Sequence, residues 1–218
     1  MQGEALLLLW NDIAPSVEPE YNRWHSREHV PERVSVPGIL AGRRYVRAAE
    51  GNDPRDPKYL SLYELESTAV LSSPRYLSLM DYPSPWSKKM RPHFSKIRRI
   101  ACQRSASNTQ GIGGCIRAIP IERTVESPED LLGRCMNVDG MIAAHWCTTD
   151  PTVPGLAWNA SDGNVSTSSG ILLLEATDVG SLDRARGEHE GLLHTLGAEI
   201  DSSIFVLHHL VEQQEDSR

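Results

Sequence analysis

The chain has 218 residues, enough for one larger domain or two small ones, and its 39% hydrophobic and 23% charged content is typical of a globular protein with a real core. Its net charge of −7 argues against nucleic acid or an anionic membrane surface as the principal partner. No segment approaches the ~18 apolar residues that would span a bilayer, so no membrane partner is expected.

The N-terminal stretch predicts a strand followed by a helix. Ala5–Asp12 is a short apolar run without a preceding positive region, which is not the pattern of a signal peptide. After two prolines that bracket a turn, Glu18–Glu20 place acidic residues where a helix dipole favours them. Pro31 cannot donate to the carbonyl of Arg27, so the helix is expected to kink or restart there before Pro37-Gly38 ends it.

The remainder of the first hundred residues predicts three strands and a second helix. Alternation of side chains indicates strands at Ile39–Ala48, Tyr59–Glu66 and Phe94–Arg104, with a helix at Thr68–Met80 that Pro74 interrupts, and loops at Gly51–Pro57 and Tyr82–Pro92. The basic clusters Lys88–Arg91 and Lys96–Arg99 are interpreted as solvated faces of a loop and a strand. The element order of this half is therefore β-α-β-β-α-β.

The same order recurs after a segment rich in Ser, Asn and Gly, residues 105–114, which is the best candidate for a linker. Strands are predicted at Cys115–Ile121, Gly140–Thr149, Ile171–Thr177 and Ser203–Val211, helices from Ser127 and at Leu182–Leu196, and a long polar loop at Asp150–Ser169. Two short patterns match between the halves: Gly38–Arg44 with Gly140–Trp146, and Leu60–Glu64 with Ile171–Glu175.

These patterns predict an α+β protein made of two ferredoxin-like β-α-β-β-α-β repeats, residues 1–104 and 115–218, joined by the linker. Each repeat would form a four-stranded antiparallel sheet with helices on one face. The two sheets could then bury their bare faces against each other, as the subunits of a homodimer would, and form an intramolecular barrel. A homodimer of the two-repeat chain is a further possibility.

The four cysteines stand far apart and form no CxxC pair. This spacing predicts reduced, mostly buried thiols in a cytoplasmic protein and makes zinc binding through them a poor interpretation. They are Cys102, Cys115, Cys135 and Cys147.

Residues 20–33 carry the densest chemistry in the chain. On a helical projection Tyr21, Trp24 and Glu28 fall within roughly 60° of each other. His25 and His29 continue round the same side, so an aromatic stripe becomes ionisable along one face. Carboxylate and imidazole groups beside aromatic rings are partly desolvated, which is how acid and base groups acquire perturbed pKa values. The stretch therefore predicts a pocket.

The spacing of the two histidines also allows a metal site. His25, Glu28 and His29 spell HxxEH, the inverted zincin signature, but Pro31 and the short chain remove the peptidase context. A simpler mononuclear site would need a third ligand, such as Glu32, His93 or a residue from a strand. His208 and His209 alternate across a strand and are interpreted as satisfied core or surface histidines.

Acid/base chemistry is the better interpretation of this stretch. Either His25 or His29 could transfer a proton near pH 7, with Glu28 to orient or tune it. Tyr45 and Tyr63 could supply a hydroxyl to polarise a carbonyl or a phenol. The competing interpretation is structural: Glu28 and one histidine would pair with Arg43 or Arg44 and lock the helix to the sheet.

A family resemblance supports the same fold. The run Trp24-His25-x-x-Glu28-His29-Val30-Pro31-Glu32-Arg33, then Val36-Pro37-Gly38 and Arg43-Arg44-Tyr45, is similar to EthD-like members of the dimeric α+β barrel superfamily, as is Pro83–Met90. The likeness covers about the first hundred residues. It implies small hydrophobic or aromatic ligands held between sheet and helices. Superfamily members include cofactor-free monooxygenases, isomerases, cyclases and lyases, together with haem enzymes, so the resemblance implies the fold better than the reaction.

The leading hypothesis is a cofactor-independent enzyme acting on a small aromatic or keto compound in an N-terminal cavity, with no metal. The second half lacks a histidine on its matching helix and is expected to be structural. The alternative is a non-catalytic ligand-binding or stress-associated protein. The catalytic candidates are His25, Glu28 and His29, and the ligand-binding candidates are Tyr21, Trp24, Arg43, Arg44, Tyr45, Tyr63 and Trp86.

Overall fold

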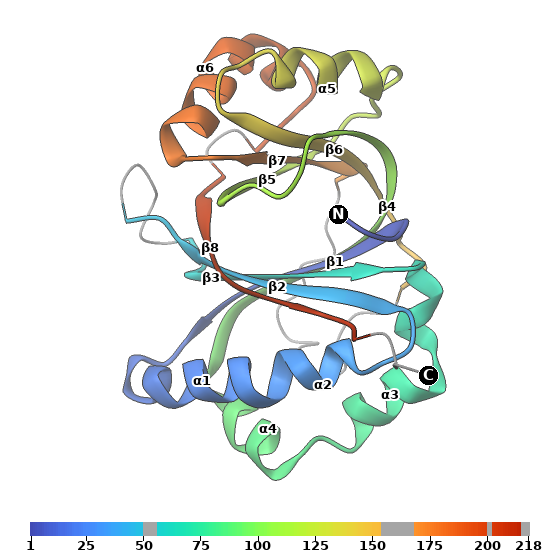
Figure 1. The fold of residues 1–218 in the computed structure, drawn as a ribbon, viewed down its shortest axis with the longest axis vertical. Helices are drawn as coiled ribbons and strands as arrows, with labels where there is room; N and C mark the ends of the chain where they lie inside the picture. Colours follow the sequence, from blue (N-terminus) through green and yellow to red (C-terminus); the bar gives the residue numbers. More distant parts are fainter. Residues whose placement is uncertain (50–55, 154–167, 200–201, 215–218) are drawn as a thin grey trace.

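The computed structural model describes residues 1–49, 56–153, 168–199 and 202–214, and in this part of the chain eight antiparallel strands close into a barrel. The strand order round the barrel is β1-β3-β2-β8-β5-β7-β6-β4. Helices α1 to α4 pack at one end of the molecule and α5 and α6 at the other, with the barrel between them (Figure 1).

The strands and helices have the following bounds. The strands are β1 Ala5–Ile13, β2 Ile39–Arg47, β3 Tyr59–Leu65, β4 Phe94–Thr109, β5 Cys115–Ile121, β6 Met141–Thr149, β7 Gly170–Ala176 and β8 Ile204–Glu212. The α-helices are α1 Glu18–Trp24, α2 Val30–Val34, α3 Pro74–Asp81, α4 Pro85–Met90, α5 Pro128–Met136 and α6 Val179–Thr195. A π-helical segment, His25–His29, joins α1 to α2, and short 3₁₀ turns occupy Pro15–Val17, Thr68–Ser72 and Arg91–His93.

Both halves of the chain use the same strand order, β4-β1-β3-β2 in the first and β8-β5-β7-β6 in the second. The barrel closes because the fourth strand of each half also pairs with the second strand of the other half: β4 with β6 and β8 with β2. In these two junctions Cys102 lies opposite Thr149, and Arg44 lies opposite His209. Closure gives each described strand a neighbour on both sides over at least part of its length, which reduces the open edge available for edge-to-edge aggregation.

Alternation along the strands separates two kinds of core. One set of side chains fills the barrel interior, with Leu8, Leu62, Ile116 and Leu173 among its fully buried members. The opposite set faces the helices and forms separate apolar clusters, two in the first half and one in the second. Because successive strand residues point to opposite faces, neighbouring residues serve different environments.

Several predicted elements differ from the observed ones. The helix passes through Pro31 without a break, because the preceding π turn lets the amide of Val30 bond to the carbonyl of His25. The predicted helix at Thr68–Met80 is a 3₁₀ turn followed by α3, which starts at Pro74 with Ser73 as its N-cap. The predicted loop Tyr82–Pro92 contains α4, capped in the same way by Ser84.

The strand predicted to end at Arg104 continues to Thr109, because residues 106–109 pair with β6. A Ser- and Asn-rich composition favoured a loop here, and cross-half pairing overrides that preference. The predicted loops at 51–57 and 150–169 lie largely outside the described residues.

All four cysteines are buried free thiols. Among the described helices, none is long and apolar enough to cross a membrane.

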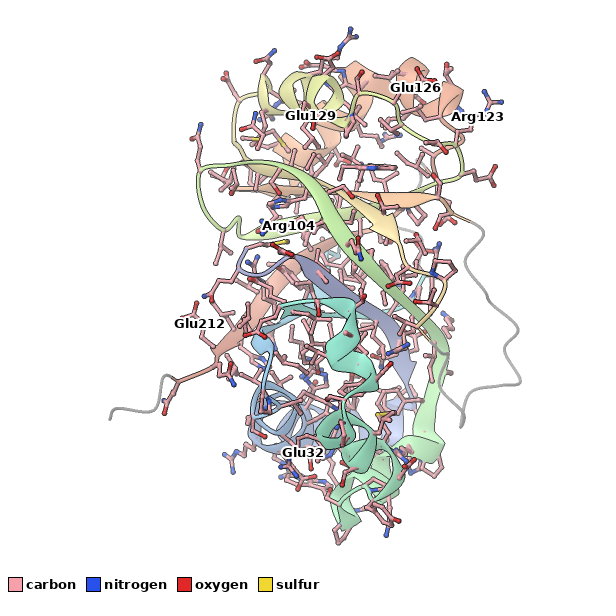
Figure 2. The ribbon with its side chains drawn as sticks, turned by 90° about the vertical axis from the view of Figure 1, so that its right-hand side faces the viewer. Glu32, Arg104, Arg123, Glu126, Glu129 and Glu212 are labelled. Carbon is pink, nitrogen blue, oxygen red and sulfur yellow. The ribbon has the colours of Figure 1, made fainter. Side chains whose placement is uncertain are left out.

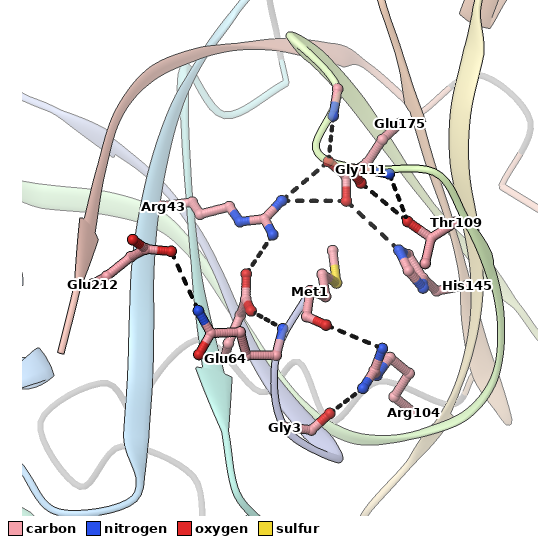
Figure 3. Close-up of polar contacts among 12 residues, drawn as sticks. Met1, Gly3, Arg43, Glu64, Arg104, Thr109, Gly111, His145, Glu175 and Glu212 are labelled. Carbon is pink, nitrogen blue, oxygen red and sulfur yellow. Dashed lines mark hydrogen bonds and ion pairs between the residues drawn. The ribbon is translucent and has the colours of Figure 1, made fainter. Parts of the chain in front are cut away.

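A charged cluster lies inside the otherwise apolar barrel. Arg43 on β2 forms an ion pair with Glu64 on β3 and donates from Nη1 to both carboxylate oxygens of Glu175 on β7, at 3.0 and 3.2 Å (Figure 3). Glu175 also accepts from the backbone amide of Gly113 at 2.9 Å, and its Oε1 lies 3.6 Å from Nε2 of His145. The side chains of Arg43, Glu64 and Glu175 are each at most 2% exposed.

Electrostatics keep the Glu175 carboxylate ionised. Burial alone would raise the pKa of Glu175, but the contact with His145, the charge of Arg43 and the amide of Gly113 hold that pKa below its usual value. Glu64 and Glu175 occupy the matched positions of the two halves, as do Arg43 and His145. The sequence match Leu60–Glu64 with Ile171–Glu175 therefore corresponds to two carboxylates that meet the same guanidinium in the barrel.

We expect Arg43→Met to lower the free energy of unfolding by about 3–5 kcal/mol, because it leaves two buried carboxylates without their cation. Urea denaturation measures the loss. The triple variant R43M/E64Q/E175Q should recover much of it. Lys89→Met, which breaks an exposed pair with Glu20, serves as control and should cost no more than about 1 kcal/mol. A loss below about 1 kcal/mol in the free energy of unfolding of R43M would contradict the structural role of the cluster.

Candidate functional site

A cavity of about 60 Å³ lies between the helix-covered face of the N-terminal strands and the helices above it. This volume exceeds the ~10–15 Å³ that one ordered water needs on the same measure. Its apolar wall is formed by Leu7, Leu9, Ile39, Met80 and Phe94, and its aromatic wall by Trp24, Tyr63 and Tyr76. The remaining lining side chains are polar or cationic: Asn11, Ser61 and Ser87, then His25 and His29, and finally Arg33, Arg91 and Arg99.

The π-helical segment carries both histidines into this cavity. Its first residue, His25, is 2% exposed, and its last residue, His29, is partly exposed. The two imidazole centroids lie 5.2 Å apart, and the ring of His29 packs on Trp24 at 4.4 Å. Single π turns inside α-helices occur frequently at functional sites. Here the turn places the histidines at the cavity and also accommodates Pro31.

Both imidazoles are neutral at pH 7. Burial lowers the pKa of His25 well below its ordinary value, and the charge of Arg44 adds to this effect. Burial also lowers the pKa of His29, with the charges of Arg33 and Arg91 as the next causes. A neutral imidazole has one nitrogen that can accept a proton, so each histidine is in the protonation state of a general base.

Four buried polar atoms at this cavity have no hydrogen-bond partner within the described chain. They are Nδ1 of His25, Nδ1 of His29, the hydroxyl of Tyr63 and Nη1 of Arg33. The other nitrogen of His25, Nε2, is hydrogen-bonded to Oγ of Ser61 at 3.1 Å. Buried polar atoms are nearly always paired in folded proteins, so four unpaired ones around one cavity indicate a binding site for a polar group.

Tyr21 and Arg44 lie behind the cavity wall and hold the helix to the sheet. The Tyr21 hydroxyl pairs with the side-chain amide of Asn11, and burial raises its pKa to about 12. The Arg44 guanidinium stacks over the rings of Tyr21 and Tyr59 at 4.8 and 4.5 Å. Arg44 also donates to Asn22 at 2.7 Å. Neither Tyr21 nor Arg44 lines the cavity.

Glu28 and Trp86 connect helices instead of contacting the cavity. The Glu28 carboxylate accepts from the Trp24 indole at 3.2 Å and from the hydroxyl of Ser84, the N-cap of α4. The Trp86 indole donates to Glu20 at 3.2 Å, which ties α4 to α1. The structure thus gives Glu28 a contact with α4 and no hydrogen bond to either histidine.

Arg43 and Tyr45 lie on the opposite side of the sheet from the cavity. Both belong to the barrel interior, where Nη1 of Arg43 lies 3.4 Å from the Tyr45 hydroxyl. The prediction that they contact the same ligand as His25 is not supported by this geometry. The sequence did place Arg43 and Tyr45 on one face of β2, but it gave no sign of which face the helices cover.

Three arginines and two serines that line the cavity, Arg33, Arg91, Arg99, Ser61 and Ser87, were not predicted from the sequence. Arg33 was part of the motif stretch without an assigned role, and Arg91 and Arg99 belonged to basic clusters interpreted as solvated. Arg99 shares a face with the buried residues Ile97 and Ala101, and that alternation was a usable signal. Ser61 on β3 carried no signal of its own.

His209 on β8 adds a third imidazole near the site. Its ring lies 6.2 Å from that of His25, and burial together with Arg44 lowers its pKa to about 4. In the described ranges no group of three or more His, Cys, Asp or Glu side chains is arranged to hold a metal ion.

Comparison with known proteins identifies the fold. No protein-family profile matches the sequence, and no curated protein matches it. An anthrone oxidase-like protein of known structure matches 97% of this chain and 93% of its own, with a TM-score of 0.65 and 11% identity. A proposed monooxygenase from Lactobacillus acidophilus NCFM matches 97% of both chains (TM-score 0.57, 12% identity). A proposed chlorite dismutase matches 95% of this chain and 96% of its own (TM-score 0.56, 13% identity).

The chain has the fold of these structures, an α+β fold with a closed eight-stranded antiparallel barrel. Each match spans nearly the full length of this chain and of the chain it is compared with, so the similarity concerns the whole barrel and not one half. This confirms the α+β barrel fold expected from the sequence. Sequence identities of 11–13% support a similarity of fold and not of function.

We expect protonation of His25 to destabilise the fold. Its folded-state pKa lies below the ~6.5 of an unfolded chain, so as pH falls through that value only the unfolded state takes up the proton. Stability should therefore fall by up to ~1.4 kcal/mol per pH unit from this residue, and His29 and His209 act in the same direction. Urea denaturation at pH 7.5, 6.5 and 5.5 should show a smaller slope for His25→Gln. If stability depends on pH equally in His25→Gln and in the wild-type protein, the lowered pKa assigned to His25 is wrong.

We expect Glu28→Ala to lower the free energy of unfolding by about 1–2 kcal/mol, because Trp24 and the N-cap of α4 lose their shared acceptor. Amide hydrogen exchange should show faster opening of Pro85–Met90 in this variant. Arg27→Ala, an exposed neighbour on the same segment, should change stability by less than about 0.5 kcal/mol. Equal effects of the two substitutions would contradict the anchoring role of Glu28.

Proposed function

We propose that this protein is an enzyme that removes or transfers a proton on a small aromatic or keto compound bound in the N-terminal cavity, without a cofactor. The observation that carries the proposal is the set of four unpaired polar atoms on side chains that line a cavity with apolar and aromatic walls. Two of them belong to neutral imidazoles, one to a hydroxyl and one to a guanidinium. This combination of base, hydrogen-bond donor and cation suits a substrate that develops negative charge on oxygen.

His29 is the better-placed base of the two histidines. It is partly exposed and has a buried Nδ1 without a partner, whereas His25 lies deeper and is hydrogen-bonded to Ser61. The Ser61 contact fixes the ring orientation of His25, and the buried Nδ1 has no hydrogen-bond partner in the described chain. His25 can then hold the ligand, while His29 removes the proton from carbon and returns the same proton to the product.

Tyr63 is the hydroxyl donor in this proposal. It lines the cavity, is 4% exposed, and burial raises its pKa, so the hydroxyl stays protonated at neutral pH. A protonated phenol can donate to a carbonyl or enolate oxygen and stabilise the charge that forms there. Oxygenation, isomerisation and lyase cleavage all remain possible outcomes, because each can start from the same carbanion or enolate.

A haem does not fit the residues present. The cavity encloses about 60 Å³, which is far too small for a macrocycle, and Nε2 of His25 is hydrogen-bonded to Ser61. The helix-covered face of the C-terminal strands is filled by a continuous apolar cluster that includes Leu132, Trp146 and Leu182. No step of the proposed reaction therefore uses a haem.

The chain organisation supports a single site of this kind. We infer that residues 1–104 and 115–218 are tandem ferredoxin-like units, the first resembling EthD-like proteins, because both halves share one strand order. In the second half, α5 lacks a histidine and the space under the helices is packed with apolar side chains. The first half would then hold the site and the second half would complete the barrel.

A non-catalytic ligand-binding protein is the alternative. It needs the same cavity and the same unpaired atoms but no proton transfer. The strongly lowered pKa values of both histidines favour this alternative if no ligand restores their basicity, since a general base works best when its pKa is near the working pH.

Deuterium exchange distinguishes the two, because it detects the first common step whatever product follows. We expect the protein to accelerate the loss of acidic C–H signals from members of a panel of phenols and small 1,3-dicarbonyl compounds in D₂O, followed by proton NMR. His29→Gln should slow exchange by about 10²–10⁴-fold if His29 is the base.

His194→Gln, an exposed histidine of α6, is the matched control and should exchange at the wild-type rate. Folded His29→Gln and His25→Gln variants that both retain the wild-type rate would refute the proposal. Ligand binding without any exchange would establish the binding-protein alternative.

A further inference from the structure

A second group of reactive side chains lies near the end of β4, where the first half of the chain pairs with β6 of the second half. Ser107 on β4 lies opposite His145 on β6, and its Oγ is 2.8 Å from Nδ1 of that imidazole. The other ring nitrogen, Nε2, faces Oε1 of Glu175 on β7 at 3.6 Å. A hydroxyl, an imidazole and a carboxylate therefore follow one another in the order of a Ser-His-Glu triad.

This group is separate from the N-terminal cavity. None of its three side chains lines that cavity. Figure 2 shows Arg104, which lies on the same strand as Ser107, between the end of the molecule that carries Glu32 and the end that carries Glu126. The reaction proposed for the cavity makes no use of these side chains.

The contacts of His145 fix its tautomer. The ionised carboxylate of Glu175 only accepts hydrogen bonds, so the ring nitrogen that faces it, Nε2, carries the hydrogen. Nδ1 is then the basic nitrogen, and it accepts from the hydroxyl of Ser107. The backbone amide of Gly113 and the guanidinium of Arg43 hold the Glu175 carboxylate in place. His145 is thus oriented as the base of a serine nucleophile.

The charge cluster inside the barrel lies directly behind this base. Glu64 and Glu175 share the single guanidinium of Arg43, so two carboxylates face one cation. The negative charge that is left over can stabilise an imidazolium formed at His145 in a transition state. Because this part of the barrel is buried, the effect is larger than it would be in water.

Arg104 supplies a cation on the other side of Ser107. Its Nη1 donates to Oγ of Ser107 at 3.4 Å, and the backbone carbonyls of Met1 and Gly3 also accept from its guanidinium. Its Nε is buried and has no hydrogen-bond partner within the described chain. A guanidinium held in this way can donate to the oxyanion that forms when Ser107 attacks a carbonyl carbon.

The exposure of the three side chains matches these roles. Ser107 is exposed, so a substrate in solution can reach its hydroxyl. The side chains of His145 and Glu175 are 0% exposed, so water does not compete for the base or for the carboxylate. An open nucleophile beside a shielded base is an arrangement that acyl transfer can use.

We propose that Ser107 is the nucleophile of a second activity, the hydrolysis of small carboxylic esters at this end of the barrel. Oγ of Ser107 bonds to the ester carbonyl carbon and its proton passes to Nδ1 of His145. The C–O bond to the alcohol then breaks, and the departing alcohol oxygen takes that proton. Water adds to the acyl carbon and passes a proton to His145, the bond to Oγ breaks, Oγ takes up the proton, and the carboxylic acid leaves. This activity does not depend on the reaction proposed for the cavity.

p-Nitrophenyl acetate tests the activity, and a fluorophosphonate tests the nucleophile. We expect the protein to release p-nitrophenolate and Ser107→Ala to lower that rate by about 10²-fold or more. The fluorophosphonate should bond to Oγ of Ser107 with loss of fluoride, and peptide mass spectrometry locates the adduct. His145→Gln should slow both reactions, and Ser107→Ala alone decides if His145→Gln does not fold.

Glu175 acts through His145 and is a positioning residue. In a folded Glu175→Gln variant we expect kcat for p-nitrophenyl acetate to fall by about 10²-fold or more with KM unchanged, because the tautomer of His145 is no longer fixed. An unchanged kcat in that variant would remove Glu175 from the proposal.

Ser105→Ala is the matched control, since Ser105 is an exposed serine of the same strand. It should leave both the hydrolysis rate and the labelling unchanged. Hydrolysis no faster than without protein, a wild-type rate in Ser107→Ala, or a fluorophosphonate adduct on a residue other than Ser107 would each overturn the assignment.

Discussion

The guanidinium of Arg43, held between Glu64 and Glu175, constrains how the two halves of the chain assemble. One carboxylate comes from each half, so the ion cluster forms only when both sets of strands are in register. Apolar contacts in the barrel interior tolerate small shifts, whereas three buried charges do not. The helix-covered face depends on that register too, because β2 carries Arg43 toward the interior and Arg44 toward the helix on adjacent residues.

The fold was largely readable from the sequence, and the side-chain environment of the site was not. Element order and the matched patterns at Gly38–Arg44 and Leu60–Glu64 depend on local alternation, which a sequence displays directly. Which face of β2 the helices cover depends on contacts with distant strands, so Arg43 and Tyr45 were assigned to the ligand although they face the barrel. Arg91 and Arg99 were missed because a basic cluster is usually solvated.

Within the motif stretch, the histidines and the carboxylate have separate tasks. His25 and His29 reach the cavity through the π turn, whereas Glu28 holds the N-cap of α4 and the indole of Trp24. Helical projection assumed uniform α geometry, and the π turn changes the phase of every residue after it. That is why the predicted catalytic trio, contiguous on the projection, divides between two surfaces in the structure.

The pairing of β8 with β2 has a consequence for how the chain reaches this structure during synthesis. Ala41 pairs with Glu212, and β2 can have its second neighbour only after Ile204–Glu212 leaves the ribosome. Until then a long strand edge stays open in the growing chain, which is the condition under which nascent proteins aggregate or recruit chaperones. Contacts this distant in sequence also slow folding, so closure of the barrel is the expected late event.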